Sequence, residues 1–179
     1  ALSTNTVFPN IEFVWRMLVA IYEKQNKKFK AINACLQLIK LVPQDFTAYT
    51  NLGILYIETA QLIKAEETLR KAIEFNSYDF FTQYNLGITL IDLGKLQEAE
   101  LRLTTAKAID SNHAEVHYKL GFVLYKLGKV NESVLSYKQA LIIEPQNFLV
   151  LNSLGVVLRD LKQYNAVSYT HLTLPTMFE

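Results

Sequence analysis

Several features are scarce in this sequence of 179 residues, and each scarcity excludes something. A single cysteine excludes an internal disulfide framework. Arg16 interrupts the longest apolar run, so no run reaches the roughly 18 residues of a membrane-spanning helix, and we expect no membrane insertion. Basic and acidic residues nearly balance, at 18 to 17, which argues against a nucleic-acid partner. With only six glycines and four prolines to interrupt them, we expect long helices and an all-α fold.

The glycines that are present recur at intervals of 34 residues. They occupy two tracks of that period: Gly53, Gly87, Gly121 and Gly155, and Gly94 and Gly128. Leucine follows the same period at five positions: Leu18, Leu52, Leu86, Leu120 and Leu154. A fixed period of this length indicates a repeat architecture in which each unit packs on its neighbours.

Each unit is predicted to form a helix–turn–helix pair. In the second unit, apolar residues recur at spacings of three and four from Tyr49 to Tyr56, and again from Leu62 to Ala72. Those spacings place them on one face of each helix. The break falls near Gly94 or Gly128 in later units, where glycine can adopt the left-handed conformation. The units end at Asp45, Asp79, His113 and Asn147, three of which are good N-cap residues for the next helix.

These features resemble the tetratricopeptide repeat, a helical pair with the same period. The second unit reads Tyr49-Thr-Asn-Leu-Gly-x-x-Tyr56, and the first carries Trp15 and Pro43 at the family's Trp and Pro positions. One departure is Gln83, which replaces the first aromatic residue of the third unit. The resemblance implies an α-solenoid, a right-handed superhelix whose first helices line a concave groove. By the same resemblance, that groove binds a segment of a partner protein.

The repeat also sets the expected domain boundaries. We expect a lead-in at residues 1–11, an array at residues 12–165 and a tail at residues 166–179. The repeats are then 12–45, 46–79, 80–113, 114–147 and a truncated 148–165. Residues 167–179 depart from the pattern and resemble the translation of a transposon-type sequencing adapter. We therefore expect the native sequence to end at Asn165 and the tail to be non-native, the native protein continuing with at least a second helix.

The resemblance places the groove residues at the second, fifth, sixth, ninth, twelfth and thirteenth positions of each unit. In the first two units these are Phe13, Arg16, Met17, Ala20, Glu23, Lys24, Thr47, Thr50, Asn51, Ile54, Ile57 and Glu58. Over all five units the groove positions hold five basic and five acidic residues, which offers no track for phosphates. Family members that hold chaperone C-termini use a set of Lys, Asn and Arg residues that no three consecutive units match. We expect no such carboxylate clamp.

Eight groove residues are candidates for partner contacts. They form an amide track, Asn51 and Asn85 continued by Lys119, and an aromatic set, Phe81, Tyr84, Tyr118, Phe122 and Tyr125. An amide can pair with a peptide backbone, and the track resembles the asparagine ladder of protein O-GlcNAc transferases. Alternatively, asparagine is simply common at this position. The aromatic residues are typical interface anchors, or some of them pack as core between neighbouring helices.

No arrangement of residues predicts catalysis, a cofactor or a metal site. His113 and His117 are four residues apart without a further ligand nearby, and Cys35 lies on a core track as a small hydrophobe. The sequence therefore predicts a protein- or peptide-binding scaffold that is not an enzyme, with the cytoplasm as the default compartment and an organelle as the alternative. The competing hypothesis is the repeat region of a larger enzyme, either a glycosyltransferase similar to O-GlcNAc transferases or a sulfotransferase.

Overall fold

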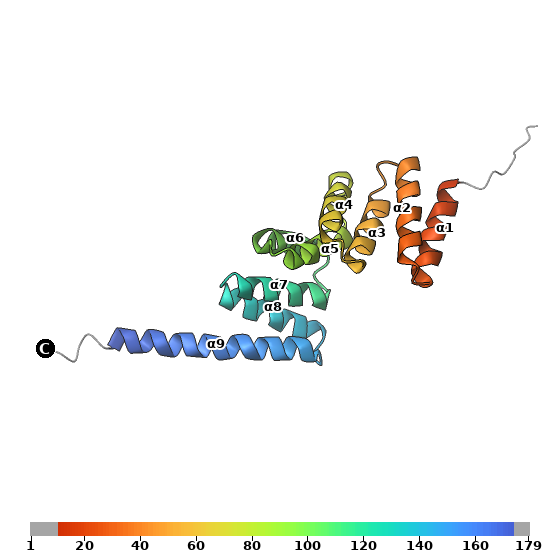
Figure 1. The fold of residues 1–179 in the computed structure, drawn as a ribbon. Helices are drawn as coiled ribbons and strands as arrows, with labels where there is room; N and C mark the ends of the chain where they lie inside the picture. Colours follow the sequence, from red (N-terminus) through yellow and green to blue (C-terminus); the bar gives the residue numbers. More distant parts are fainter. Residues whose placement is uncertain (1–10, 174–179) are drawn as a thin grey trace, which may run out of the picture. The chain divides into compact units, whose positions relative to one another are not determined.

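The computed structural model describes the backbone of residues 11–173 and the side chains of residues 11–162. Over this range the chain forms nine α-helices and no strand, which confirms the all-α helical repeat fold (Figure 1). The helices are α1 (Ile11–Lys24), α2 (Lys28–Leu41), α3 (Phe46–Glu58), α4 (Leu62–Phe75), α5 (Phe80–Asp92), α6 (Leu96–Ile109), α7 (Ala114–Lys126), α8 (Val130–Ile143) and α9 (Phe148–Thr173). None of these helices is long and apolar enough to cross a lipid bilayer.

The helices group into two compact bodies, each larger than a single repeat, which we call unit 1 and unit 2. Unit 1 (Ala1–Lys95) contains α1 to α5, and unit 2 (Leu96–Glu179) contains α6 to α9. Within each unit, consecutive helices pack against each other, as α1 does on α2 and α7 on α8. Most of the expected lead-in (residues 1–10) and the end of the expected tail (residues 174–179) lie outside the described residues. The expected junction at Asn165 falls inside α9, beyond the last described side chain.

The turn inside each repeat has the same backbone geometry every 34 residues. Its central residue is left-handed in the first four repeats: Asn26 (φ 53°), Ala60 (φ 57°), Gly94 (φ 74°) and Gly128 (φ 78°). In each turn the next N–H bonds back to a carbonyl five residues earlier, as from Lys95 to Leu90 at 2.8 Å. This is the Schellman motif, which ends a helix by satisfying its last carbonyl groups. The predicted breaks at Gly94 and Gly128 are confirmed.

The helices that open the second, third and fifth repeats have side-chain caps. Asp45 accepts hydrogen bonds from the backbone N–H groups of Thr47 at 3.1 Å and Ala48 at 3.3 Å. Asp79 does the same for Thr82 at 2.8 Å, and Asn147 for Val150 at 3.3 Å. Each bond satisfies a donor that the first helical turn leaves open. His113 occupies the same place before α7 but makes no side-chain cap hydrogen bond.

Each unit has a core in which a small residue on a first helix faces a large residue on the second. In unit 1 a Cβ on Gly53 would lie 2.5 Å from Cγ of the fully buried Leu69, and in unit 2 a Cβ on Gly121 would lie 2.9 Å from the Tyr137 ring. The glycines therefore let the paired helices approach closely. The unit 1 core is built around Val19, Ala31, Ala34, Cys35, Leu52 and Leu55, and the unit 2 core around Val134, Tyr137, Ala140, Val150 and Val157. Cys35 is buried, as predicted.

Gln83 and His117, which occupy the same position in adjacent repeats, have a structural role. Nε2 of Gln83 donates a hydrogen bond to the carbonyl oxygen of Ser77 at 2.8 Å. Nε2 of His117 lies 2.9 Å from the carbonyl oxygen of Ser111. Both side chains are buried and both reach back six residues to the loop before their own helix. These contacts give a polar atom of each buried side chain a partner and hold the preceding loop to the helix.

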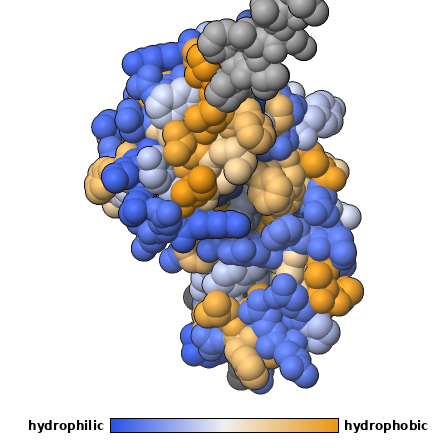
Figure 2. All heavy atoms as spheres, turned by 90° about the vertical axis from the view of Figure 1, so that its right-hand side faces the viewer, coloured by the Kyte–Doolittle hydropathy of each residue, from blue (hydrophilic) through white to orange (hydrophobic). Residues whose placement is uncertain are grey.

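The outer side of α1 is apolar and exposed. Val14 and Ile21 are exposed there, whereas the residues one repeat later, Ala48 and Leu55, are buried in unit 1. Ile11 and Met17 extend the same surface. Hydrophobic residues gather on this end of unit 1, where α1 faces the viewer (Figure 2). In α3 the corresponding face packs against α2 of the preceding repeat. The first helix α1 carries apolar residues suited to the same kind of contact.

An ion-pair network joins α4 to Lys95, which lies in the turn after α5 in the next repeat. Glu66 is buried and accepts hydrogen bonds from Nζ of Lys95 at 2.7 and 2.8 Å and from Arg70 at 2.8 Å. Burial alone would raise the pKa of Glu66, but the hydrogen bonds from Lys95 and Arg70 outweigh it and hold the pKa below its usual value of 4.5. A lowered folded-state pKa stabilises the fold above pH 4.5, and this contribution is lost as the pH falls through the folded-state pKa.

We expect Glu66→Gln to lower the free energy of unfolding by about 1 kcal/mol at pH 7, because both partners of Glu66, Lys95 and Arg70, remain partly exposed to water. At pH 3 the difference from the wild type should shrink towards zero. Urea melts at the two pH values measure it, with the exposed neighbour Glu67→Gln as the control that changes stability little at either pH. An equal loss at both pH values would contradict a charge-based role.

Candidate peptide-binding groove

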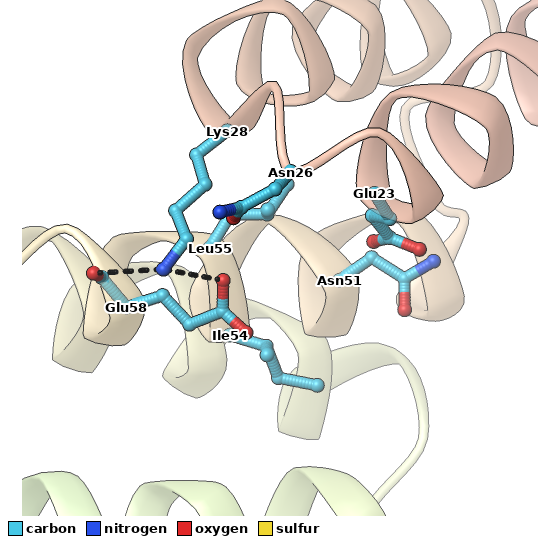
Figure 3. Close-up of a pocket in the computed structure, with 7 residues that line it drawn as sticks. All are labelled: Glu23, Asn26, Lys28, Asn51, Ile54, Leu55 and Glu58. Carbon is cyan, nitrogen blue, oxygen red and sulfur yellow. Dashed lines mark hydrogen bonds and ion pairs between the residues drawn. The ribbon is translucent and has the colours of Figure 1, made fainter.

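Two adjoining pockets lie along the first helices of unit 1. The larger, about 420 Å³, is lined by Glu23, Asn26, Lys28, Asn51, Ile54, Leu55 and Glu58 (Figure 3). The smaller, about 120 Å³, is lined by Arg16, Val19, Ala20, Glu23, Cys35, Leu38, Ala48 and Asn51. Glu23 of α1 and Asn51 of α3 line both, so the two pockets form one groove between these helices. Six of the residues in this groove are among those that the repeat register predicts for it.

The polar groups of this groove differ in how they are paired. Nζ of Lys28 lies 3.2 Å from a carboxylate oxygen of Glu58 and donates to the Glu58 carbonyl oxygen at 3.4 Å (Figure 3). Glu23 forms no ion pair or hydrogen bond within the described residues. Burial, and then the charge of Glu58, raise the pKa of Glu23 above its usual value. The groove therefore holds one carboxylate whose charge lacks a partner and is disfavoured by its surroundings.

The floor of the smaller pocket is fixed by the core and by an ion pair. Arg16 lies 2.7 Å from Asp45, the N-cap of α3, and 2.9 Å from Glu12 on its own helix. The charge of Arg16 is therefore paired within the chain, and the ion pair joins α1 to the start of α3. Burial, with smaller contributions from Glu23 and Asp45, raises the pKa of the Cys35 thiol to about 12. The thiol is thus neutral at physiological pH and acts as core, not as a nucleophile.

The two asparagines of the predicted amide track are in different states. Nδ2 of Asn85 donates to the carbonyl oxygen of Phe81 on its own helix at 2.8 Å. The side chain of Asn51 makes no hydrogen bond within the described residues and lines both pockets. Only the Asn51 amide therefore has all of its donors and acceptors available to a partner. Lys119, which continues the track in unit 2, places Nζ 5.6 Å from the centre of the Tyr118 ring.

The five candidate aromatic residues do not share one environment. Phe81 is exposed, whereas Tyr84 is buried with its ring stacked on Phe80 at 5.9 Å. In unit 2, Tyr118 and Tyr125 are half-buried and pack against the core, Tyr118 with its ring 5.9 Å from Tyr137. Phe122 is half-buried, with Nζ of Lys126 5.6 Å from the ring centre. Phe81 and Tyr84 belong to unit 1, and Tyr118, Phe122 and Tyr125 belong to unit 2.

First helices of neighbouring repeats also bond to each other at two of the predicted groove positions. At the fifth position of the second repeat, Oγ1 of Thr50 lies 2.6 Å from Oγ1 of Thr82 on the next first helix. At the twelfth position of the fourth repeat, the Tyr125 hydroxyl donates a short hydrogen bond to Asp160 of α9. The side chains of Thr50 and Tyr125 thus face the next repeat. The sixth, ninth and thirteenth positions, held by Asn51, Ile54 and Glu58, line the larger pocket.

Two polar residues that line the larger pocket, Asn26 and Lys28, lie outside the predicted groove positions. Asn26 is the left-handed residue of the first turn, and Lys28 opens α2. Both belong to the turn and not to a first helix, so a register based on first helices alone could not include them. The available signal was the charge of Lys28 close to a predicted break, which pairs across to Glu58.

Comparisons with known proteins show which family the repeats belong to. A family model described as TPR repeat matches residues 87–128 and 123–162, and one described as tetratricopeptide repeat matches residues 34–67. The chain belongs to the tetratricopeptide repeat family. No match was found among curated proteins.

Solved structures share the tetratricopeptide repeat fold at low sequence identity. A MamA structure aligns with a TM-score of 0.80 at 22% identity, over 89% of this chain and 88% of that one. MamA from Desulfovibrio magneticus RS-1 aligns with a TM-score of 0.81 at 15% identity, over 90% and 92%. YrrB, described as a TPR protein with an unusual peptide-binding site, aligns with a TM-score of 0.78 at 19% identity, over 86% and 80%. At these identities the likeness concerns the fold.

Proposed function

We propose that this tetratricopeptide repeat chain is a protein-interaction scaffold, without catalysis of its own, that binds an extended segment of a partner protein in the groove between α1 and α3. The observation that carries the proposal is the pair of adjoining pockets that share Glu23 and Asn51. A peptide-binding site in YrrB, a protein of the same fold, supports it. The function belongs to this site and not to the fold as such.

The chemistry of the groove points to a segment with a basic side chain. The Asn51 amide can donate to and accept from one peptide unit of an extended backbone, which fixes the segment without reading its sequence. Glu23 carries the carboxylate without an ion-pair partner, and a Lys or Arg side chain that entered the pocket would supply one. Ile54 and Leu55 line the same pocket and can contact the aliphatic part of such a side chain.

Peptides selected from a random display library against the full chain provide the test. We expect the selected peptides to carry a conserved Lys or Arg and to bind Asn51→Ala about threefold to tenfold more weakly, since each lost hydrogen bond is worth about 0.5–1.5 kcal/mol. Glu23→Gln should weaken binding about fivefold, as a partly exposed ion pair of about 1 kcal/mol would. Calorimetry measures both changes.

The control variant is Lys71→Ala, an exposed position on α4 away from the pocket lining, which should bind as the wild type does. Binding should also weaken as the pH is lowered through the raised pKa of Glu23, because protonation removes the charge that attracts the basic side chain. Peptides that bind both groove variants as tightly as the wild type would refute this site.

A further inference from the structure

The second helices of unit 1 both begin with an exposed apolar residue followed by a lysine. Phe29 and Lys30 stand in the first turn of α2, and Ile63 and Lys64 stand one repeat later in the first turn of α4. The apolar side chains project from the surface, Phe29 at 77% exposure and Ile63 at 67%. Both lysines are exposed as well. We name these four residues the turn edge of unit 1.

The packing of one repeat on the next leaves this position uncovered. Ile63 belongs to the second repeat, which packs on α2 of the first repeat and on α5 of the third within unit 1. Its side chain stays exposed although both neighbours are present. The equivalent residues of the third and fourth repeats, Gln97 and Asn131, are exposed too. A further repeat at either end would therefore not bury the turn edge.

The stability of the fold does not account for the residues of the turn edge. Where unit 1 has an apolar residue and a lysine, α6 has Gln97 and Glu98, and α8 has Asn131 and Glu132. A carboxylate suits the first turn of a helix because the helix N-terminus carries a partial positive charge, and a lysine there is unfavourable. A large apolar side chain in water is likewise no gain for folding. Residues that break local rules in this way are typical of functional positions.

Both lysines of the turn edge are held in the same way. Nζ of Lys30 lies 5.9 Å from the centre of the Tyr22 ring, and Nζ of Lys64 lies 5.7 Å from the centre of the Tyr56 ring. Neither lysine forms an ion pair with a carboxylate among the described side chains, although Lys64 donates to the neutral amide of Gln61 at 2.9 Å. Each repeat of unit 1 thus presents one uncompensated positive charge beside one projecting apolar side chain.

The chain next to the turn edge is locally basic. Residues 24–30 include four lysines and no acidic residue, and of these four Lys28 is paired with Glu58. Lys27, which directly precedes α2, donates only to the neutral amide of Gln25 at 2.7 Å. The turns before α2 and α4 lie at the same end of their helix pairs (Figure 1). The near balance of charge over the whole chain therefore hides a local positive excess at this end of unit 1.

This combination suits an anionic lipid surface better than another polyanion. Phe29 and Ile63 project outward and line neither groove pocket, and a bilayer interface accepts such side chains without a complementary cavity. A single-stranded nucleic acid would stack its bases on aromatic rings, and Ile63 offers none. Lysine keeps its ammonium group at the level of the headgroups while its aliphatic stem lies against apolar surface.

We propose that the turn edge docks unit 1 on a membrane with anionic headgroups, without crossing it. Phe29 and Ile63 enter the boundary between headgroups and acyl chains. Lys30 and Lys64, assisted by Lys27, face the negative charges of the lipids. Two side chains bury little apolar area, so the binding is reversible and depends on the lysines. This surface is separate from the α1–α3 groove, and the proposal does not rest on a peptide in that groove.

Co-sedimentation of the full chain with lipid vesicles measures the binding. We expect binding to vesicles of phosphatidylcholine with about 30% phosphatidylserine, and at least tenfold weaker binding to vesicles of phosphatidylcholine alone. Raising the salt from about 0.1 M to about 1 M shortens the Debye length from about 10 Å to about 3 Å and should release the chain. Equal binding to both kinds of vesicle would overturn the proposal.

Two double variants locate the site. Lys30→Glu with Lys64→Glu should weaken binding to the anionic vesicles at least tenfold. A carboxylate in the first helical turn favours the fold, so unfolding would not explain this loss. Phe29→Ser with Ile63→Ser should also weaken binding at least tenfold, and circular dichroism checks that it stays folded. Wild-type binding by either double variant would contradict the proposal.

Two control variants change similar residues elsewhere. Leu135→Ser with Lys138→Glu removes an exposed leucine and an exposed lysine of α8 in unit 2, and should bind the anionic vesicles as the wild type does. Asn51→Ala alters the groove and should also bind them unchanged, because the groove and the turn edge are separate. A loss in the α8 variant equal to that in the turn-edge variants would overturn the assignment to unit 1.

A fluorescent label at residue 63 tests whether the apolar side chains enter the lipid. Cys35 is buried and the chain has no other cysteine, so Ile63→Cys can be labelled selectively with an environment-sensitive dye. We expect a blue shift on anionic vesicles and quenching by brominated acyl chains. The same dye at Asn131→Cys, the equivalent position in unit 2, should show neither. An unshifted signal from residue 63 on bound chain would overturn the insertion of this edge.

Two other results would assign the turn edge to a different occupant and so overturn the proposal. If a single-stranded oligonucleotide or an acidic peptide binds the chain and the anionic vesicles do not, the partner is another polyanion. If the vesicles bind only after residues 1–10 are removed, a segment of the chain itself covers the edge. The proposal requires the full chain to bind the vesicles with those residues in place.

Discussion

Leu86→Ala should lower the free energy of unfolding by about 2–5 kcal/mol, the cost of removing buried methyl groups and leaving a cavity. Leu86 of α5 is fully buried and stands on the leucine track of the 34-residue period. Repeats contact only their neighbours, so a defect in the middle of the array also weakens the coupling between its ends. Urea denaturation followed by circular dichroism measures the loss.

Leu149→Ala provides the control for that measurement. It removes the same atoms from a leucine that is exposed on α9, and should change the free energy of unfolding by no more than about 0.5 kcal/mol. A loss below about 1 kcal/mol for Leu86→Ala would contradict the assignment of this leucine to the core.

Alanine should have opposite effects at two glycines that share a repeat position. At Gly53 the new Cβ would lie 2.5 Å from Cγ of the fully buried Leu69, so Gly53→Ala should cost about 1–3 kcal/mol through overpacking. At Gly155 the new Cβ would meet nothing within 4 Å, so Gly155→Ala should gain about 0.5–1 kcal/mol from the better helix propensity of alanine.

The same denaturation experiment measures both glycine variants, and each serves as the control for the other. Both glycines lie inside helices, so propensity alone would stabilise both variants by similar amounts. If Gly53→Ala were as stable as Gly155→Ala, the close approach of α3 to α4 at Gly53 would be refuted.

The helices and turns were predictable because they depend on local rules that recur with the repeat. Gly94 and Gly128 mark the breaks, since they adopt positive φ easily, and Asp45 and Asp79 mark helix starts, since their side chains cap open N–H groups. Asn26 and Ala60 adopt the same left-handed conformation without being glycine. At these two residues the packing of the helix pair imposes the turn, and only the 34-residue period predicts its position.

The candidate groove was less predictable because repeat position does not decide which way a side chain faces. Thr50 and Tyr125 are groove positions by resemblance, yet they bond to the next first helix, Thr50 to Thr82 and Tyr125 to Asp160. The direction depends on how first helices cross, which a single sequence does not specify. The partners of a charge are equally hidden, since Glu58 pairs with Lys28 from the turn while Glu23 has no such partner.

Hydrogen–deuterium exchange of the full chain, with and without a peptide selected from the display library, tests most directly that the α1–α3 groove is the partner site. We predict slower exchange in α1 and α3 around Glu23 and Asn51 in the presence of peptide, with no change in α4, whose residues do not line the groove. Protection confined to α4, or to unit 2, with α1 and α3 unchanged, would contradict the account.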